Sequence, residues 1–170
     1  MLGLWVTSWR MTVTMKILLP VDGSELSLKA VRVAVSMHQQ GLAAELVLAN
    51  VQAPANLYEM MTAPDPQVLE RVSQAAGADI LAPALALARA GGIAFESEVG
   101  AGDPAHTIID IAERYACDMI IMGARGHGTL RSALLGSVSN EVLHAAAVPV
   151  MIVKADEEAS PTDSDLGDDA

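Results

Sequence analysis

Short runs of apolar residues alternate along the chain with longer stretches in which apolar residues recur every three or four positions. Such short runs are typical of strands buried on both faces of a parallel sheet, and the longer stretches indicate amphipathic helices. The predicted strands are Lys16 to Val21, Glu45 to Val51, Ile93 to Val99, Asp118 to Met122 and Val148 to Val153. The pattern therefore predicts an α/β domain in which right-handed helical crossovers join parallel strands.

The predicted helices run roughly over residues 26–40, 66–90, 105–115 and 138–146. Residues that favour helix starts precede them: Ser24, Asp65, Asp103 and Ser137. Pro83 lies inside the second helix and predicts a kink or a break there, because proline lacks an amide N–H and its ring crowds the preceding turn.

The composition fits one domain with an aliphatic core. Hydrophobic residues make up 52% of the 170 residues and aromatic residues only 3%, so the core is built from Ala, Val, Leu, Ile and Met. The single cysteine, Cys117, excludes an intramolecular disulfide and favours a cytoplasmic location. Because no segment approaches 18 uncharged apolar residues, we expect no membrane partner.

The charge is distributed unevenly. Residues 155–170 hold seven of the 21 acidic residues and no basic ones, within a total net charge of -11. We predict a disordered, solvating tail there, with an acidic docking peptide as the alternative. The acidic balance also argues against a nucleic-acid partner.

The amino-terminal segment does not fit the pattern of the domain. Residues 1–14 contain both tryptophans and lack the charged n-region and cleavage site of a signal peptide. Met11 and Met15 are both candidate start residues, so we interpret 1–14 as a flexible leader or a mis-assigned start. The folded domain is then predicted over residues 15–154.

Two loops are candidates for a binding site. In open α/β sheets, ligands bind beyond the carboxyl ends of the strands, where the strand order reverses. The loop after the first strand contains Asp22, and the loop after the fourth carries the run "MGARGHGTLRSALLGSVS" over residues 122–139. If the first and fourth strands are neighbours, the two loops face each other across one crevice.

The second loop has the spacing Gly-x2-Gly-x9-Gly-Ser. Gly123 would let the chain leave the sheet with its backbone close to a ligand, and Gly126 and Gly128 would permit the positive φ angles that aim successive amides at an anion. Gly136 and Ser137 would begin a helix whose unpaired N–H groups favour an anion. The alternative is an ordinary helix start beside an exposed loop.

Side chains around these glycines suit a polyphosphate. Arg125, His127 and Arg131 form a cluster of potential cations, and Ser139 adds a hydroxyl. Asp22 could accept hydrogen bonds from ribose hydroxyls or hold Mg²⁺; as the alternative, it is a turn residue.

A second glycine motif is less convincing. Residues 100–105, "GAGDPA", match the dinucleotide fingerprint, but Asp103 would place a carboxylate near a pyrophosphate and Pro104 removes an amide donor. We interpret the stretch as a helix start, with Gly100 lining the neighbouring crevice.

Residues 15–154 resemble the universal stress protein family. The resemblance lies in "ILLPVDGSELSLKA", "GDPAHTIIDIAERYACDMIIMGARG" and "LLGSVSNEVLHAAAVPVMIVK". It implies an open five-stranded parallel sheet of order 3-2-1-4-5 with helices on both faces, a Rossmann-like fold. The motif G-x2-G-x9-G-[ST], which marks the ATP-binding members of that family, is intact.

The resemblance also implies a ligand and its contacts. The ligand is ATP, with or without Mg²⁺ at Asp22, and AMP or ADP are alternatives. Pro20, Val21 and Asp22 would line adenine and ribose, and Val51 would pack on the adenine. Ribose and phosphates would contact Gly123, Gly126, Gly136, Ser137, Val138 and Ser139, and Met122, Arg125, His127 and Gly100 complete the predicted set.

These features predict a nucleotide-responsive regulator of the stress response rather than an efficient enzyme. The chain has no Walker lysine and no evident base to orient a water molecule, so we expect at most slow ATP hydrolysis. The alternative is a nucleotide-free dimeric scaffold. Nucleotidyl transfer is a third option, but its signatures "HIGH" and "SGGxDS" do not occur.

The last strand predicts a homodimer. In the family's strand order, Val148 to Val153 lies at the sheet edge, and it is apolar and uncharged. Pro149 protects only one position of this edge. Pairing with the same strand of a second copy would cover the rest.

Overall fold

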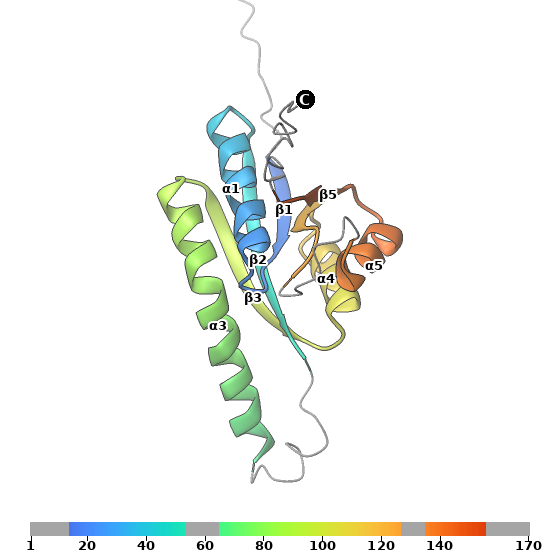
Figure 1. Cartoon of the computed structure of the whole chain (residues 1–170). Helices are drawn as coiled ribbons and strands as arrows, with labels where there is room; N and C mark the ends of the chain where they lie inside the picture. The colour runs from blue at the N-terminus through green and yellow to red at the C-terminus, as the bar shows by residue number, and fades with distance from the viewer. Residues whose placement is uncertain (1–13, 54–64, 127–134, 156–170) are drawn as a thin grey trace, which may run out of the picture.

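The computed structural model describes residues 14–53, 65–126 and 135–155. In chain order the elements are β1 (Met15–Pro20), α1 (Glu25–Gln39), β2 (Ala44–Gln52), α3 (Pro66–Ala90), β3 (Ala94–Ala101), α4 (Pro104–Arg114), β4 (Met119–Gly123), α5 (Ser137–Ala145) and β5 (Val150–Val153) (Figure 1).

The five strands form one parallel sheet of order β3-β2-β1-β4-β5. This confirms the predicted fold class and strand order. In the register of the sheet, Pro20 lies opposite Ala49, and Gly123 lies opposite Val153. The carboxyl ends of β1, β2, β4 and β5 therefore lie along the same edge.

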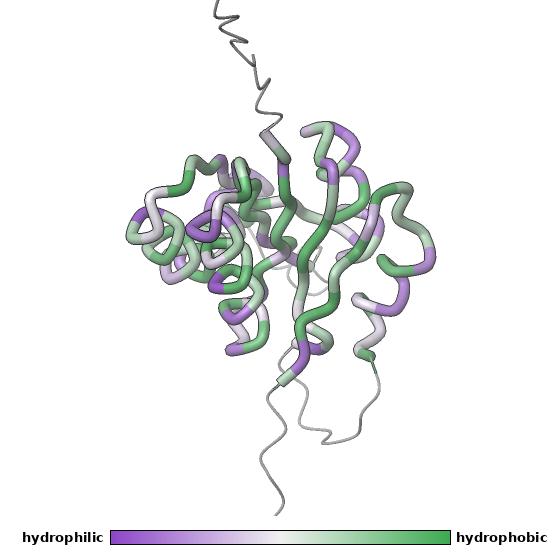
Figure 2. The backbone as a smooth tube through the Cα atoms, turned by 90° about the horizontal axis from the view of Figure 1, so that it is seen from above, coloured by the Kyte–Doolittle hydropathy of each residue, from purple (hydrophilic) through white to green (hydrophobic). Residues whose placement is uncertain are grey.

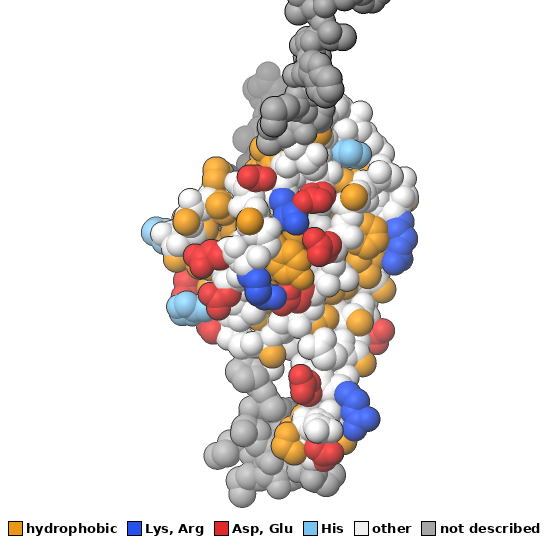
Figure 3. Space-filling model, turned by 180° about the vertical axis from the view of Figure 1, so that it is seen from behind, with side chains coloured by type: hydrophobic (Ala, Val, Ile, Leu, Met, Phe, Trp, Pro, Cys, Tyr) orange, Lys and Arg blue, Asp and Glu red, His pale blue; other side chains and the backbone are white. Residues whose placement is uncertain are grey.

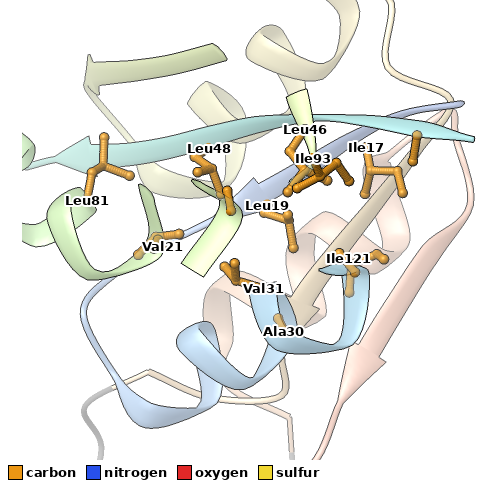
Figure 4. Packing of buried hydrophobic residues seen from close by; sticks show 14 of the residues in the cluster. Ile17, Leu19, Val21, Ala30, Val31, Leu46, Leu48, Leu81, Ile93 and Ile121 are labelled. Atoms are coloured by element: carbon orange, nitrogen blue, oxygen red, sulfur yellow. The ribbon is translucent and has the colours of Figure 1, made fainter. Parts of the chain in front are cut away.

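One face of the sheet packs against α1 and α3. Successive side chains of a strand point to opposite faces, so Ile17 and Leu19 of β1 face this side and both are fully buried. Figure 4 shows them packed with Leu46 and Leu48 of β2 and Val31 of α1. Burying each of these larger side chains stabilises the fold by about 2 kcal/mol.

The opposite face packs against α4 and α5. Leu18 and Val47 meet Ile108 and Ile111 of α4 and Val142 of α5 in a second cluster, which also contains Cys117. Because both faces are covered, the central strands β1 and β4 are hydrophobic along nearly their whole length, whereas the helices alternate between hydrophobic and hydrophilic positions (Figure 2). The edge strand β3 is more polar, with Glu96, Ser97 and Glu98 in its middle.

The predicted caps account for three helix starts. Ser24 Oγ accepts from Ser27 N at 3.2 Å, Asp65 Oδ1 accepts from Gln67 N at 2.9 Å, and Asp103 Oδ1 accepts from His106 N at 3.0 Å. The fourth start differs from the prediction. Gly136 rather than Ser137 is the N-cap of α5, with φ -68° and ψ 162°, and no side chain caps the helix.

The break predicted at Pro83 is absent, because α3 runs without interruption from Pro66 to Ala90. Pro83 is exposed, and so is Asp79, whose carbonyl cannot receive an N–H from the proline four residues later. Water can solvate that carbonyl, so a proline on the outer side of a helix costs less than one facing the core.

The predicted strand limits hold to within a few residues. The largest differences are of two residues: β3 ends at Ala101 instead of Val99, and β5 begins at Val150 instead of Val148. Pro149 lacks an N–H for the ladder, although its carbonyl accepts from Ile120 N at 2.9 Å.

Several predicted features lie outside the described residues: almost all of the leader, His127, Gly128, Arg131 and nearly all of the acidic tail. Within the three described ranges, no helix is long and apolar enough to cross a bilayer.

Candidate functional site

A crevice of about 610 Å³ opens at the carboxyl edge of β1, β2 and β4. The starts of α4 and α5 close its sides. It brings together Pro20, Val21, Asp22, Val51, Met122, Gly123, Arg125, Gly126, Gly136, Ser137, Val138 and Ser139, all of which were predicted as site residues. The volume lies within the range of small-molecule sites.

Gly100 does not line this crevice. It lies in β3, where a Cβ would meet Thr107 Cγ2 at 2.8 Å and Ile111 Cδ1 at 3.5 Å. Its missing side chain makes room for α4 rather than for a ligand.

The two predicted loops approach each other at Asp22 and Gly126. Asp22 is exposed at the end of β1, and its Oδ1 accepts from Ser24 N at 2.9 Å. A Cβ on Gly126 would overlap its Oδ2. The loops after β1 and β4 therefore face each other closely enough that one glycine makes room for one carboxylate.

The glycines act differently from the prediction. Gly126 does not have a positive φ, so the conformational freedom of glycine is not what this position uses. At Gly123, a Cβ would lie 3.0 Å from Leu26 Cβ and 3.1 Å from Leu26 C. Gly123 thus lets α1 approach the end of β4. It also lines the crevice, and the predicted close approach to a ligand stays a prediction.

The carbonyl of Ala124 fixes the start of α5. It accepts from Gly136 N at 2.8 Å and from Ser139 Oγ at 2.7 Å. Ser139 Oγ also lies 3.0 Å from Gly136 O and is only 3% exposed. Its single proton is therefore directed to protein carbonyls, and its main role is to join α5 to the loop after β4.

The first turn of α5 faces the crevice without a side-chain cap. Gly136, Ser137 and Val138 line the crevice, and Ser137 is exposed. Asn140 N donates to Gly136 O at 2.9 Å, whereas amides earlier in a helix have no partner within it. These amides and the positive end of the helix dipole favour an anion.

The sequence reasoning missed six lining residues: Ser27, Ala49, Asn50, Pro104, Ile108 and Leu135. Asn50 is the most informative of them. It is 3% exposed, its Nδ2 donates to Val21 O at 2.8 Å, and its Oδ1 accepts from Gln52 Nε2 at 2.5 Å. The signal was a lone polar residue inside the apolar run "LVLANV".

Exposed ionisable groups surround the start of α4. His106 Nδ1 lies 2.9 Å from Asp103 Oδ1 and 4.0 Å from Glu141 Oε1 of α5. The hydrogen bond to Asp103 is the main reason that the pKa of His106 is raised. The pKa of Asp103 is lowered, chiefly because its carboxylate accepts from the His106 backbone N–H and then from its imidazole.

A second charge network lies on the sheet face beyond α4. Arg114 makes a two-pronged pair with Glu98 at 2.7 and 2.9 Å, and this pairing lowers the pKa of Glu98. Lys16 pairs with Glu45 at 3.1 Å and Glu96 at 3.3 Å. Figure 3 shows acidic and basic side chains interspersed on the back of the molecule. The arrangement indicates solvated ion pairs there rather than a basic patch.

The chemistry available in the crevice is limited. Among its described lining residues, Asp22 and Arg125 carry the only ionisable side chains. Ser27, Asn50, Ser137 and Ser139 add uncharged polar groups, and the rest of the wall is apolar, with Val51, Ile108 and Met122 from three different elements. The arrangement suits a flat apolar group joined to a polar, anionic one.

Comparison with known proteins gives consistent results. The model of the Universal stress protein family matches residues 14–154. Universal stress protein YxiE of Bacillus subtilis is 32% identical over 146 residues, which span 82% of this chain and 98% of YxiE.

Solved structures agree with the fold. The structure of MJ0577, a universal stress protein of Methanocaldococcus jannaschii, superposes with a TM-score of 0.70 at 27% identity, covering 83% of this chain and 96% of that one. A universal stress protein in complex with cAMP superposes with a TM-score of 0.58 at 26% identity, covering 82% and 95%.

Proposed function

The chain belongs to the universal stress protein family, which supports a role in the stress response, and from this premise we propose that its crevice binds an adenine nucleotide, with ATP as the first candidate. AMP, ADP and a cyclic nucleotide are the other candidates. The related protein bound to cAMP supports a nucleotide as the ligand class.

The base would lie against the aliphatic walls. Val51 follows the buried part of β2 and is half-buried, and Ile108 reaches the crevice from α4. A planar, weakly polar ring gains from burial against such side chains at about 25 cal/mol for each Å² of apolar surface. Pro20 and Val21 supply the floor at the end of β1.

The sugar and phosphates would lie across the mouth of the crevice. The Asp22 carboxylate can accept from ribose hydroxyls, which are hydrogen-bond donors. The phosphates would meet the uncapped first turn of α5 at Ser137 and Val138, with Arg125 on the opposite loop.

Mg²⁺ fits this arrangement only as a companion of the nucleotide. Asp22 is the only carboxylate among the described lining residues, and Mg²⁺ commonly binds one or two carboxylates together with substrate phosphates. The same lining offers no lysine and no histidine. We therefore propose a site that holds a nucleotide and hydrolyses it slowly if at all.

The observation that carries the proposal is the exposed Asp22 carboxylate facing the uncapped start of α5 across one apolar crevice. Isothermal titration calorimetry with ATP, AMP and adenosine on Asp22→Asn tests it. Asn can keep the bond that Oδ1 accepts from Ser24 N but loses the charge, and we expect about a tenfold lower affinity for all three.

A matched control is Asp65→Asn. Asp65 accepts from an amide two residues later at 2.9 Å, as Asp22 does, but it lies at the start of α3 and does not line the crevice. Equal affinities of the two variants would contradict the site assignment. An empty protein at millimolar ATP in native mass spectrometry would favour the nucleotide-free scaffold.

We also propose that the protein is a homodimer through β5. This strand lies at the sheet edge, paired with β4 on one side, and Val150, Met151 and Ile152 are half-buried in the single chain. A second copy of the strand would cover them. Sedimentation equilibrium at micromolar concentration should give twice the chain mass, and a monomeric mass would contradict the dimer.

A further inference from the structure

Asn50 of β2 is a buried amide at the edge of the crevice. It lines the crevice but is only 3% exposed. Its Nδ2 donates to Val21 O at 2.8 Å, and its Oδ1 accepts from Gln52 Nε2. Both polar atoms of this side chain have partners within the protein, so Asn50 can act on a ligand through the chain that it holds.

The bond from Asn50 fixes the direction in which the chain leaves β1. Val21 N donates to Ala49 O at 2.7 Å, so the pairing of β1 with β2 continues for one residue past Pro20. The Asn50 side chain then donates to the carbonyl of the same Val21. Because Val21 C=O and Asp22 N–H belong to one planar peptide group, holding that carbonyl orients the peptide next to which the Asp22 side chain projects.

Helix α3 confines Asn50 from the other side. A Cβ on Gly77 of α3 would lie 3.0 Å from Asn50 Oδ1 and would overlap Val99 Cγ1 of β3. Gly77 is buried in the middle of the helix, where glycine costs about 1 kcal/mol relative to alanine. The missing side chain lets α3 approach the sheet and leaves the amide of Asn50 little freedom to turn.

Resting on the proposed function, we infer that Asn50 is a positioning residue of the nucleotide site, which acts through Asp22. It orients the peptide between Val21 and Asp22, so that the carboxylate meets the ribose hydroxyls in a good hydrogen-bonding geometry. Hydrogen bonds weaken steeply when their angle departs from linearity. A tilt of this peptide therefore lowers the affinity for ligands with ribose hydroxyls and spares ligands without them.

The test compares Asn50→Leu with the native chain, because Leu has a similar shape and no donor. Adenosine and 2′,3′-dideoxyadenosine share the base and are uncharged, and only adenosine has the 2′- and 3′-hydroxyls. In calorimetry we expect Asn50→Leu to bind adenosine about fivefold more weakly and 2′,3′-dideoxyadenosine with unchanged affinity. In the Asp22→Asn background the same substitution should cause little further loss.

Gln52→Ala is the matched control. It removes the donor to Asn50 Oδ1 and keeps the bond to Val21 O, so its affinity for adenosine should stay within about twofold of the native value. Asn50→Ser repeats the comparison with a smaller side chain, so that a poorly folded Asn50→Leu protein does not decide the result.

Equal losses for the two ligands would overturn the inference, because that pattern indicates a purely structural role for Asn50. Unchanged adenosine affinity in the Asn50 variants would also overturn it and leave the nucleotide site intact. Losses from Asn50→Leu and Asp22→Asn that simply add would show that Asn50 does not act through Asp22.

A second readout needs no ligand. Ser24 N donates to Asp22 Oδ1, so the amide resonance of Ser24 in ¹⁵N–¹H spectra should shift in Asn50→Leu and stay in place in Gln52→Ala. An unshifted Ser24 resonance in Asn50→Leu would overturn the inference. If the native chain bound neither adenosine nor ATP, the proposed function would fail, and this resonance would still decide whether Asn50 controls the position of Asp22.

Discussion

Asp22 Oδ2 lies so close to the backbone of Gly126 that a Cβ on that glycine would overlap it unless the carboxylate moved. The two residues are far apart in the sequence and end neighbouring strands of the sheet. Their contact brings the only described carboxylate of the crevice against the loop that leads towards α5. The position of Asp22 thus depends on a residue that offers no side chain.

Gly126→Ala should weaken nucleotide binding by displacing the Asp22 carboxylate. Loss of a charged hydrogen bond to the ribose predicts about a tenfold lower affinity. In the Asp22→Ala background the same substitution should cost little more, because the atom it collides with is gone. Calorimetry on both single variants and the double variant measures this coupling, and additive losses would contradict it.

Gly136→Asp should separate stability from binding. A Cβ at this position has its nearest neighbours at 3.5 Å, an ordinary contact distance, and Asp is a good N-cap. We expect the free energy of unfolding to stay constant or to rise by a few tenths of a kcal/mol. ATP affinity should fall more than tenfold, because the carboxylate occupies the anion end of α5.

Gly123→Ala is the matched comparison for that variant. Its Cβ would meet Leu26 at 3.0–3.1 Å, so overpacking should cost about 1–3 kcal/mol in urea unfolding. A stable Gly123→Ala protein would show that α1 can move away from the end of β4.

Asn50→Ala should destabilise the fold by about 1–3 kcal/mol, because it leaves the buried Val21 carbonyl without its side-chain donor. Gln52→Ala is the control, since it removes the neighbour that donates to Asn50 Oδ1 but keeps the bond to Val21. Urea unfolding should show the larger loss for Asn50→Ala. Similar losses for the two variants would indicate that the bond to Val21 contributes little.

The His106–Asp103 pair predicts a pH dependence of stability. Its partners raise the pKa of His106 above the ordinary value of 6.5, with Asp103 the main cause and Glu141 and Asp110 adding to it. A raised folded-state pKa stabilises the protein fully below pH 6.5, and this contribution is lost as pH rises through the folded-state pKa. The protonated imidazole is the form that is stabilised.

Urea unfolding of the native chain and His106→Gln at pH 5.5 and pH 8.5 measures this contribution. The native chain should be the more stable at pH 5.5, and the difference should shrink at pH 8.5. His144→Gln serves as the comparison, because the Nδ1 of His144 lies 2.7 Å from the backbone carbonyl of Asn140. A difference that grows with pH would contradict the assignment.

The sequence predicted the layers of the fold well because its apolar pattern is a direct consequence of burial on both sheet faces. Runs such as "ILLPV" have no reason to be apolar throughout unless helices cover both sides. The strand order was implied by the family resemblance, since hydropathy does not say which strands pair. The predicted break at Pro83 was wrong because a one-dimensional pattern does not show that its side of α3 faces water, whereas the alternative, a kink, stays a prediction.

Most of the predicted site residues line the crevice, but the contacts that several of them make were not predicted. Gly123 and Gly126 are needed for contacts with Leu26 and Asp22, which lie about a hundred positions away in the sequence. Ser139 was assigned to the ligand, but its hydroxyl donates to protein carbonyls. Such roles depend on tertiary neighbours, which residue spacing along the chain does not contain.

The carbonyl of Ala124 attaches the start of α5 to the loop after β4. Because this carbonyl accepts from both Gly136 N and Ser139 Oγ, the start of α5 is fixed in position next to the end of β4. The position of the start of α5 therefore does not depend on the sequence between Ala124 and Gly136, which includes His127 and Arg131. Exchanging that segment for one of another sequence would leave the two hydrogen bonds that position the start of α5 in place.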